Sequence, residues 1–294
     1  MKSIWLLGNP ISHSLSPIFQ NAGLQHLNIE AKYSVRAVDT RELSKVMAEM
    51  RSGDVLGANI TIPYKTTIMD HLDEIDPFAI SVGAVNTVLV QHKGSGTRLV
   101  GYNTDVRGII DPIINSGFEL PKSRAVLIGT GGAALSAFQA LVNLDVSHVD
   151  IIARNVVAAA AFVNRSRLVD VSIHDLADIE HDTFASLIAR ADLIVQATPV
   201  GMHSGLSPNR SPIPEEVMKQ GLTKSLGPTL IFELVYAPRE TVFLRLAREY
   251  GNNKTVYIEG LEMLLHQGAE SFKIWTEHSA PIQIMRASLG LADV

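Results

Sequence analysis

Lys65 and Asp105 are the two charged members of a polar set that follows the predicted strands in the first part of the chain. A lysine can take or give a hydroxyl proton when burial or a neighbour tunes its pKa, and an adjacent carboxylate can orient it. A structural interpretation is also open, in which Lys65 begins a helix at the surface and Asp105 caps the next helix. Residue types and periodicity alone favour this structural interpretation.

The uncharged members of the set are hydroxyl and amide side chains. In open α/β sheets, ligands bind at the carboxyl ends of the strands, so these side chains are expected at one edge of a sheet. A lining of this kind suits a small polyhydroxylated ligand. The uncharged members are Ser14, Ser16, Asn59, Thr61, Asn86, Thr87, Asn103 and Thr104.

A glycine cluster in the middle of the chain predicts a second kind of site. Residues 124–137 read as an apolar strand, a tight turn and a helix start, with Gly129, Gly131 and Ala134 at the spaced small positions of a dinucleotide-binding fingerprint. Gly129 permits the turn, Gly131 lets backbone approach a pyrophosphate, and Ala134 lets the helix pack on the strand. The phosphates would lie at the positive end of the helix. An ordinary glycine turn in a core is the alternative.

The elements that must position these residues alternate between strand and helix. In the first part the pattern predicts a mostly parallel open sheet, followed by a hairpin that adds an antiparallel pair. The predicted strands there are 3–8, 32–38 and 55–61. The predicted helices are 16–27, one capped by Thr40 and ending near Gly53, and one following Lys65, and the hairpin joins 84–91 to 97–102. A helix from about Asp105 to Asn115 follows.

The second part repeats the alternation around the glycine turn, and the chain then becomes helical from Arg239 onward. We expect the helical tail to brace the first domain. The predicted strands are 124–129, 149–153, 169–173, 192–197 and 229–234, and the predicted C-terminal helices are 240–250, 262–276 and 281–289. The fold class is therefore α/β with two domains, which a length of 294 residues also favours.

Composition excludes several classes of function. The chain carries 25 Lys+Arg against 30 Asp+Glu and no basic run, so neither nucleic acid nor a membrane surface is an expected partner. It contains no cysteine, and its ten histidines form no HxxxH or HExxH array, so no metal site is expected. There is no signal-peptide core or apolar stretch long enough to span a membrane, and we expect a cytoplasmic protein.

Seven sequence blocks, in order along nearly the whole chain, resemble the shikimate dehydrogenase family. Any one block alone would be a weak match. The blocks are Gly8-Asn9-Pro10-Ile11 with His13-Ser14-Leu15-Ser16-Pro17, Asn59 to Lys65, Gly83-Ala84-Val85-Asn86-Thr87, Gly101-Tyr102-Asn103-Thr104-Asp105, Gly129 to Ala134, Ala197 to Met202, and Gly260 to Leu264 with Gln267.

The resemblance implies reversible reduction of 3-dehydroshikimate to shikimate with a nicotinamide cofactor, a step of the shikimate pathway of aromatic amino acid biosynthesis. It implies a substrate-binding domain of residues 1–104, completed by C-terminal helices about 262–294, and a Rossmann domain of residues 105–261 for NAD(P). With it, the interpretation of Lys65 and Asp105 changes to an acid/base pair. The same resemblance assigns Ser14, Ser16, Asn59, Thr61, Asn86, Tyr236 and Gln267 to the substrate, and Gly129, Gly131, Gly132, Ala133, Arg154, Thr198, Leu234 and Gly260 to the cofactor.

Departures from the family pattern concern the cofactor. Arg154 remains and could face the 2′-phosphate of NADP, while no acidic residue follows to bind an adenosine ribose, so NADP is expected and NAD is the alternative. A second basic residue after Arg154 is missing, and Leu135 replaces an arginine often found after the glycine turn. Gln196 stands where Asn is usual, and Glu262 stands where Gly is usual.

Two other functions remain open. One is a quinate/shikimate dehydrogenase that uses NAD or NADP, since Tyr102 to Asp105 and Leu264 to Glu270 also look like that branch. The other is a family member without turnover that binds such ligands as a sensor. A pure binder need not keep a proton-transfer pair, which argues against the sensor. The expected assembly is a monomer or a homodimer.

Overall fold

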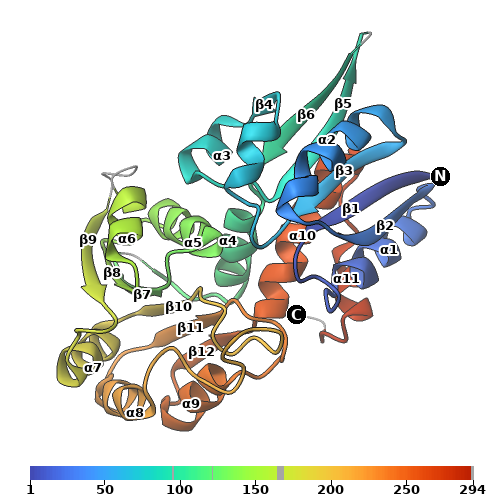
Figure 1. The fold of residues 1–294 in the computed structure, drawn as a ribbon. Helices are drawn as coiled ribbons and strands as arrows, with labels where there is room; N and C mark the ends of the chain where they lie inside the picture. Colours follow the sequence, from blue (N-terminus) through green and yellow to red (C-terminus); the bar gives the residue numbers. More distant parts are fainter. Residues whose placement is uncertain (95, 121, 164–168, 293–294) are drawn as a thin grey trace. The chain divides into compact units, whose positions relative to one another are not determined.

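The computed structural model describes residues 1–294 apart from 95, 121, 164–168 and 293–294. The chain divides into two compact units (Figure 1). Unit 1 combines Met1–Gly108 with Leu264–Val294, and unit 2 is Ile109–Met263. Both units are built from strands and helices, as the α/β pattern predicts. Among the described helices, none has the length and apolarity that a membrane span requires.

Unit 1 contains a mixed sheet in the order β2-β1-β3-β5-β6-β4. β1 runs parallel to β2 and β3, whereas β5 runs antiparallel to β3 and β6, which confirms the predicted hairpin. Ser95, in the connection of that hairpin, lies outside the described residues. The strands are β1 (Lys2–Gly8), β2 (Ala31–Ala37), β3 (Val55–Ile60), β4 (Glu74–Ile75), β5 (Thr87–Lys93) and β6 (Gly96–Tyr102).

Helices cover both faces of this sheet. On one face α2 packs Val46, Met47 and Met50 onto apolar strand residues such as Leu7 and Val88. The contacting pair of α1 and α11 lies on the other face, together with α10 (Figure 1). The helices of unit 1 are α1 (Ser16–His26), α2 (Leu43–Ser52), α3 (Pro77–Val82) and α11 (Ile282–Ser288), with the first residues of α4 (Asp105–Asn115) and the larger part of α10 (Gly260–Thr276).

Two local predictions in unit 1 are wrong. Thr40 does not cap α2, because Asp39 caps a 3₁₀ turn, η1 (Thr40–Glu42), in a reciprocal capping box with Glu42. The residues after Lys65 form only a second 3₁₀ turn, η2 (Thr67–His71), in place of an α-helix. The helical segment ends early because Asp73 holds the chain on the sheet. Its backbone N–H donates to the carbonyl of Leu99 in β6, and its carboxylate accepts from the N–H of Leu99.

Unit 2 contains a parallel sheet in the order β12-β11-β10-β7-β8-β9. The strand order reverses between β7 and β10, as in a doubly wound dinucleotide-binding sheet. The strands are β7 (Arg124–Ile128), β8 (His148–Ala153), β9 (Asp170–Asp175), β10 (Leu193–Gln196), β11 (Thr229–Glu233) and β12 (Thr255–Ile258). β12 corrects the prediction of a purely helical tail, because Thr255 to Ile258 pair with Thr229 to Phe232.

The helices of unit 2 lie on both faces of its sheet (Figure 1). α5 and α6 lie on one face. α7, α8 and α9 lie on the other, where Phe184, Met218 and Phe243 pack against Val126 and Ile194. The bounds are α5 (Gly132–Asn143), α6 (Val156–Val163), α7 (His181–Arg190), α8 (Glu215–Lys224) and α9 (Val242–Tyr250).

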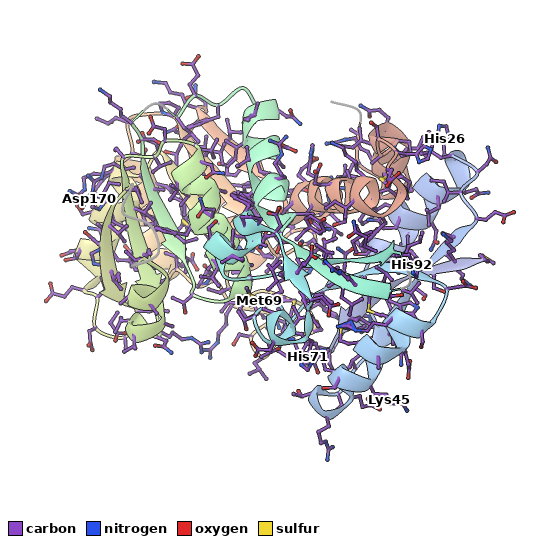
Figure 2. All side chains as sticks on the ribbon, turned by 90° about the horizontal axis from the view of Figure 1, so that it is seen from above. His26, Lys45, Met69, His71, His92 and Asp170 are labelled. Atoms are coloured by element: carbon purple, nitrogen blue, oxygen red, sulfur yellow. The ribbon has the colours of Figure 1, made fainter. Side chains whose placement is uncertain are left out.

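A buried carboxylate ties three strands of unit 2 together away from the glycine turn. Asp150 of β8 contacts His174 of β9 at 2.9 Å, His148 at 3.3 Å and Arg124 of β7 at 3.4 Å. His148 in turn contacts Asp170, which Figure 2 labels on β9. Burial acts to raise the pKa of Asp150, but hydrogen bonds from His174 and His148 and their charges hold it below its ordinary value.

This lowered pKa predicts a pH-dependent contribution to folding. The carboxylate stabilises the folded state above the unfolded pKa of aspartate, and that stabilisation is lost as pH falls through the lower folded pKa. Asp150→Asn is therefore expected to lower the free energy of unfolding at pH 7 by about 2 kcal/mol, the range for hydrogen bonds to charged groups. Urea unfolding at pH 7 and pH 3 should show the difference shrinking in acid. An equal difference at both pH values would contradict this assignment.

Candidate active site

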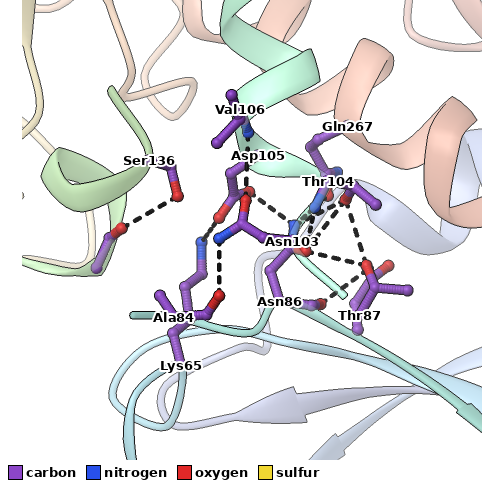
Figure 3. Close-up of polar contacts among 12 residues, drawn as sticks. Lys65, Ala84, Asn86, Thr87, Asn103, Thr104, Asp105, Val106, Ser136 and Gln267 are labelled. Atoms are coloured by element: carbon purple, nitrogen blue, oxygen red, sulfur yellow. Dashed lines mark hydrogen bonds and ion pairs between the residues drawn. The ribbon is translucent and has the colours of Figure 1, made fainter. Parts of the chain in front are cut away.

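Lys65 and Asp105 form a largely buried ion pair in unit 1. The Lys65 Nζ lies 2.6 Å from Asp105 Oδ2, and the side chains are 15% and 4% exposed (Figure 3). Lys65 follows β3, and Asp105 is the first residue of α4, directly after β6. The backbone N–H of Val106 in α4 bonds to the side chain of Asn103. The carboxylate of Asp105 faces the lysine, and the Lys65 ammonium is not a surface group.

Asn86 holds the second oxygen of the aspartate. Its Nδ2 donates to Asp105 Oδ1 at 2.8 Å, and its Oδ1 accepts from the backbone N–H of Thr104 at 2.8 Å. The same amide nitrogen lies 3.3 Å from Oε1 of Gln267 on α10. Figure 3 shows these side chains converging from the strand ends and two helices. Both carboxylate oxygens therefore have partners, which fixes the direction of the carboxylate toward Lys65.

A second layer of buried hydroxyl groups supports Asn86. Ser271 Oγ lies 2.8 Å from Thr87 Oγ1 and 2.9 Å from Thr104 Oγ1, and it donates to the backbone carbonyl of Gln267. The sequence had singled out Thr87 and Thr104 but not Ser271. The available signal was its spacing, because a residue four positions after Gln267 lies on the same face of a helix.

Asn59 is also part of this buried layer. Its Oδ1 accepts from the hydroxyl of Tyr33 at 2.9 Å, and its Nδ2 donates to Ser271 Oγ and Thr87 Oγ1 at 3.1 Å. Both ends of the amide thus contact protein groups. Tyr33 was not among the residues predicted from the sequence.

Ser14, Ser16 and Thr61 lie at the carboxyl ends of the neighbouring strands β1 and β3. The backbone N–H of Ser16, which begins α1, donates to Ser14 Oγ at 3.2 Å. The ends of β1 and β3 lie close together, because a Cβ on Gly8 would lie 2.9 Å from the carbonyl oxygen of Ile62. On the same side, Gln20 of α1 donates to the carbonyl of Gly268 at 2.9 Å and fixes α1 against α10.

In unit 2 the glycine turn has the backbone that a dinucleotide site requires. Gly129 has a φ of 118°, and a Cβ there would lie 2.9 Å from the carbonyl oxygen of Ala197. A Cβ on Gly131 would meet nothing within 4 Å, so space is open in front of α5. Gly131 is the N-cap of α5 and provides no side-chain cap, and α5 begins at Gly132. Free N–H groups at a helix start suit a phosphate, so this turn fits a pyrophosphate.

The glycine pair yields a prediction with a built-in control. Gly129→Ala is expected to destabilise the protein by about 1–3 kcal/mol, because alanine disfavours this φ and its Cβ meets Ala197. Gly131→Ala should leave the melting temperature within about 2 °C but weaken NADPH binding about tenfold or more, because its methyl group occupies the open space. Thermal unfolding and fluorescence titration with NADPH measure both effects. The reverse pattern would contradict the assigned roles.

The remaining predicted cofactor residues lie on the same edge of unit 2. Arg154 follows β8 and is exposed, and Thr198 and Leu234 follow β10 and β11. A Cβ on Gly260, the first residue of α10, would clash with the carbonyl of Val235. Of the departures from the family pattern, Glu262 lies in the first turn of α10, Leu135 is half-buried in α5, and Gln196 is the buried last residue of β10.

Two segments of the chain match models of one protein family. Residues 6–88 match the family model for the shikimate dehydrogenase substrate binding domain, and residues 260–289 match that for the shikimate 5′-dehydrogenase C-terminal domain. A shikimate dehydrogenase (NADP(+)) of Bacillus cereus is 33% identical over 289 residues, which cover 97% of each chain. The chain belongs to the shikimate dehydrogenase family.

Two solved structures extend the likeness to the whole fold. The shikimate 5-dehydrogenase of Thermus thermophilus, in complex with NADP(H) and shikimate, is 31% identical over 98% of each chain, with a TM-score of 0.80. A quinate dehydrogenase of Corynebacterium glutamicum, in complex with NAD, is 25% identical over 98% of each chain, with a TM-score of 0.81. Both are similar to the present chain along nearly its full length.

Proposed function

We propose that this member of the shikimate dehydrogenase family catalyses the reversible reduction of 3-dehydroshikimate to shikimate with NADP(H), with Lys65 and Asp105 as its proton-transfer pair. The observation that carries the proposal is the buried 2.6 Å contact between Lys65 Nζ and Asp105 Oδ2, set among amides and hydroxyls at the carboxyl ends of strands. A hydrolase would need a nucleophile elbow, which Ser14 and Ser16 lack.

The chain's residues move the proton of this reaction. NADPH, when bound, supplies the hydride that reduces the carbonyl carbon. The Lys65 ammonium donates a proton to the carbonyl oxygen, so reduction consumes one proton in total. In the reverse direction the neutral Lys65 amine takes the proton of the hydroxyl. The Asp105 carboxylate accepts from Lys65 Nζ and fixes its position, and Asn86 fixes Asp105.

The other polar residues of unit 1 hold the substrate in place. Ser14 and Ser16 carry hydroxyl donors suited to the substrate carboxylate, and Thr61 and Gln267 are suited to ring hydroxyls. The family resemblance also assigns Asn59 and Asn86 to the substrate, and Asn59 in addition donates to Thr87 and Ser271 behind Asn86. The family resemblance adds Tyr236 of unit 2 to the substrate-binding residues.

Cofactor binding falls to unit 2. The backbone of Gly129, Gly131, Gly132 and Ala133 would receive the pyrophosphate at the start of α5. Arg154, exposed after β8, would face the 2′-phosphate, and this favours NADP over NAD. Thr198, Leu234 and Gly260 are the remaining cofactor residues that the family resemblance assigns.

Quinate oxidation with NAD is the second candidate. It is favoured by the similarity to the quinate dehydrogenase of Corynebacterium glutamicum and by the loss of positive charge at Leu135. The chain keeps Arg154 but lacks the second of the two basic residues usual for NADP in this family. The preference between NADP and NAD is therefore the property to measure. A cytoplasmic location and a monomer or homodimer also stay predictions.

An assay that crosses shikimate and quinate with NADP and NAD tests the proposal. Formation of reduced nicotinamide is followed by absorbance, with purified protein and equal concentrations of each pair. We expect the highest kcat/KM with shikimate and NADP. A higher value with quinate and NAD would establish the second candidate. If the protein binds shikimate but shows no turnover in any of the four combinations, both dehydrogenase candidates are overturned and a ligand sensor is supported.

A further inference from the structure

Two buried polar side chains of unit 2 have no role in the chemistry described above. Glu233 is the last residue of β11, and Gln196 is the last residue of β10. The two lie in register on adjacent parallel strands, and both are 0% exposed. A glutamate is rarely buried to this extent unless its carboxyl group is paired with other polar groups. Their position is the carboxyl edge of a doubly wound sheet, where ligands of such sheets bind.

Glu233 fixes both ends of the segment that follows β11. Its Oε1 accepts from the backbone N–H of Val235 at 2.8 Å, and its Oε2 accepts from the hydroxyl of Thr241 at 2.7 Å. Thr241 is the N-cap of α9 and accepts from the backbone N–H of Leu244. One carboxyl group thus spans residues 235–241, a segment that includes Tyr236. Gly260 packs directly against the carbonyl of Val235 in this segment.

Gln196 fixes the segment after β10 in the same manner. Its Oε1 accepts from the backbone N–H of Thr198 at 2.6 Å, and its Nε2 donates to the carbonyls of Thr198 at 3.1 Å and Val200 at 3.0 Å. The backbone carbonyl of Gln196 also accepts from the N–H of Leu234, at the start of the other segment, at 3.0 Å. Ala197, within this segment, is the residue that packs on Gly129. The two residues therefore join both loops to each other and to the glycine turn.

The charge of Glu233 indicates which substitution preserves its role. Burial raises the pKa of this carboxyl to about 8, and hydrogen bonds from Val235, Thr241, Gln196 and Leu234 offset burial only in part. At neutral pH the carboxyl is therefore mainly protonated, with Oε1 accepting from Val235 and the protonated oxygen facing the Thr241 hydroxyl. Glutamine has the same length and is neutral, so it can keep the contact with Val235. Aspartate is one methylene shorter and cannot reach both Val235 and Thr241.

We propose that Glu233, acting with Gln196, is a positioning residue that holds the loops after β10 and β11 in the conformation that binds the nicotinamide cofactor. The inference rests on the proposed function, because Thr198 and Leu234 are assigned to the cofactor there. Neither Glu233 nor Gln196 needs to touch the cofactor. Their effect passes through hydrogen bonds to backbone groups of the two loops.

The test compares Glu233→Asp, Glu233→Gln and a matched control. Asp192→Asn is the control, because Asp192 accepts from the backbone N–H of Arg124 at the amino end of β10, opposite to Gln196. NADPH affinity is measured by fluorescence titration, and amide hydrogen exchange is measured on the free protein. Glu233→Asp should raise the Kd for NADPH about tenfold, which corresponds to the net loss of one hydrogen bond. It should also speed exchange at Thr198 and Val235.

Glu233→Gln and Asp192→Asn should keep the Kd for NADPH within about twofold of the wild-type value. A change of this size is smaller than the net loss of one hydrogen bond would cause. In Glu233→Asp, kcat at saturating NADP should fall less than kcat/KM for NADP. A folded Glu233→Asp with wild-type affinity and exchange would overturn the inference, as would equal weakening by the aspartate and glutamine variants. If Glu233→Asp does not fold, Gln196→Asn is the substitute and should loosen the loop at Thr198. Failure of the wild-type protein to bind NADPH would overturn the proposed function itself.

Discussion

Replacing Lys65 by alanine is expected to lower kcat for shikimate oxidation by a factor of about 10² or more, the usual contribution of a positioned acid or base. Among the described residues, only the Lys65 ammonium contacts Asp105 Oδ2, at 2.6 Å, so no other group takes its place as the acid or base. The fold should persist, because Asn86 still donates to Asp105 Oδ1. Steady-state kinetics with NADP and a melting curve measure the two effects.

Lys45 provides the control for Lys65→Ala. It is an exposed lysine on α2, and Figure 2 shows it extending away from the rest of unit 1. Lys45→Ala removes the same functional group from a site without substrate and should leave kcat unchanged. Undiminished turnover in Lys65→Ala would remove Lys65 from the mechanism. An equal loss in both variants would show a general effect of charge.

Replacing Asp105 by asparagine is the second large expected effect. Asparagine has the same shape but no charge, so it loses the ion pair with Lys65 and can turn a donor toward Nζ. We expect kcat to fall by a factor of about 10 to 10², which corresponds to about 1.4–2.7 kcal/mol of lost transition-state stabilisation. The KM for NADP should change little, because Asp105 belongs to unit 1 and the glycine turn to unit 2.

Asp182 offers the matched control for Asp105. It also lies in the first turn of a helix, α7, but it is exposed and contacts Gln220. Asp182→Asn should leave kcat unchanged. A normal kcat in Asp105→Asn, with the protein folded, would show that the carboxylate is not needed to orient Lys65. A large rise in the KM for NADP would point to a role in cofactor binding instead.

Most strands and the hairpin could be predicted because their apolar runs are bounded by glycine, proline and polar residues. β12 could not, since Thr255 to Ile258 is a run of four residues between two strongly helical segments. Its strand conformation comes from pairing with β11, which is a tertiary effect. The short turn after Lys65 depends in the same way on the contact of Asp73 with Leu99. Local patterns do not contain such contacts.

The candidate site could be predicted only in part, again because local patterns do not contain tertiary contacts. The rule that strand ends meet at one edge collects Lys65, Asp105 and Asn86 although 40 residues separate the first two. It does not say which amides face a ligand and which support others. Ser271 and Tyr33, which bond to Asn59, lie outside the strand ends that the rule covers. Glu233 likewise sits in an apolar strand, where the sequence alone suggests no partner.

A double-mutant cycle on Lys65 and Asp105 tests whether the two residues act together in proton transfer. If the two residues act as one proton-transfer unit, their effects on kcat are not additive, because removing either disables the pair. The double variant Lys65→Ala/Asp105→Asn also removes the buried charge that Lys65→Ala leaves unpaired. We predict a kcat for the double variant within about threefold of that of Lys65→Ala alone. A further loss equal to the full effect of Asp105→Asn would show that the two residues act independently and contradict their role as one proton-transfer unit.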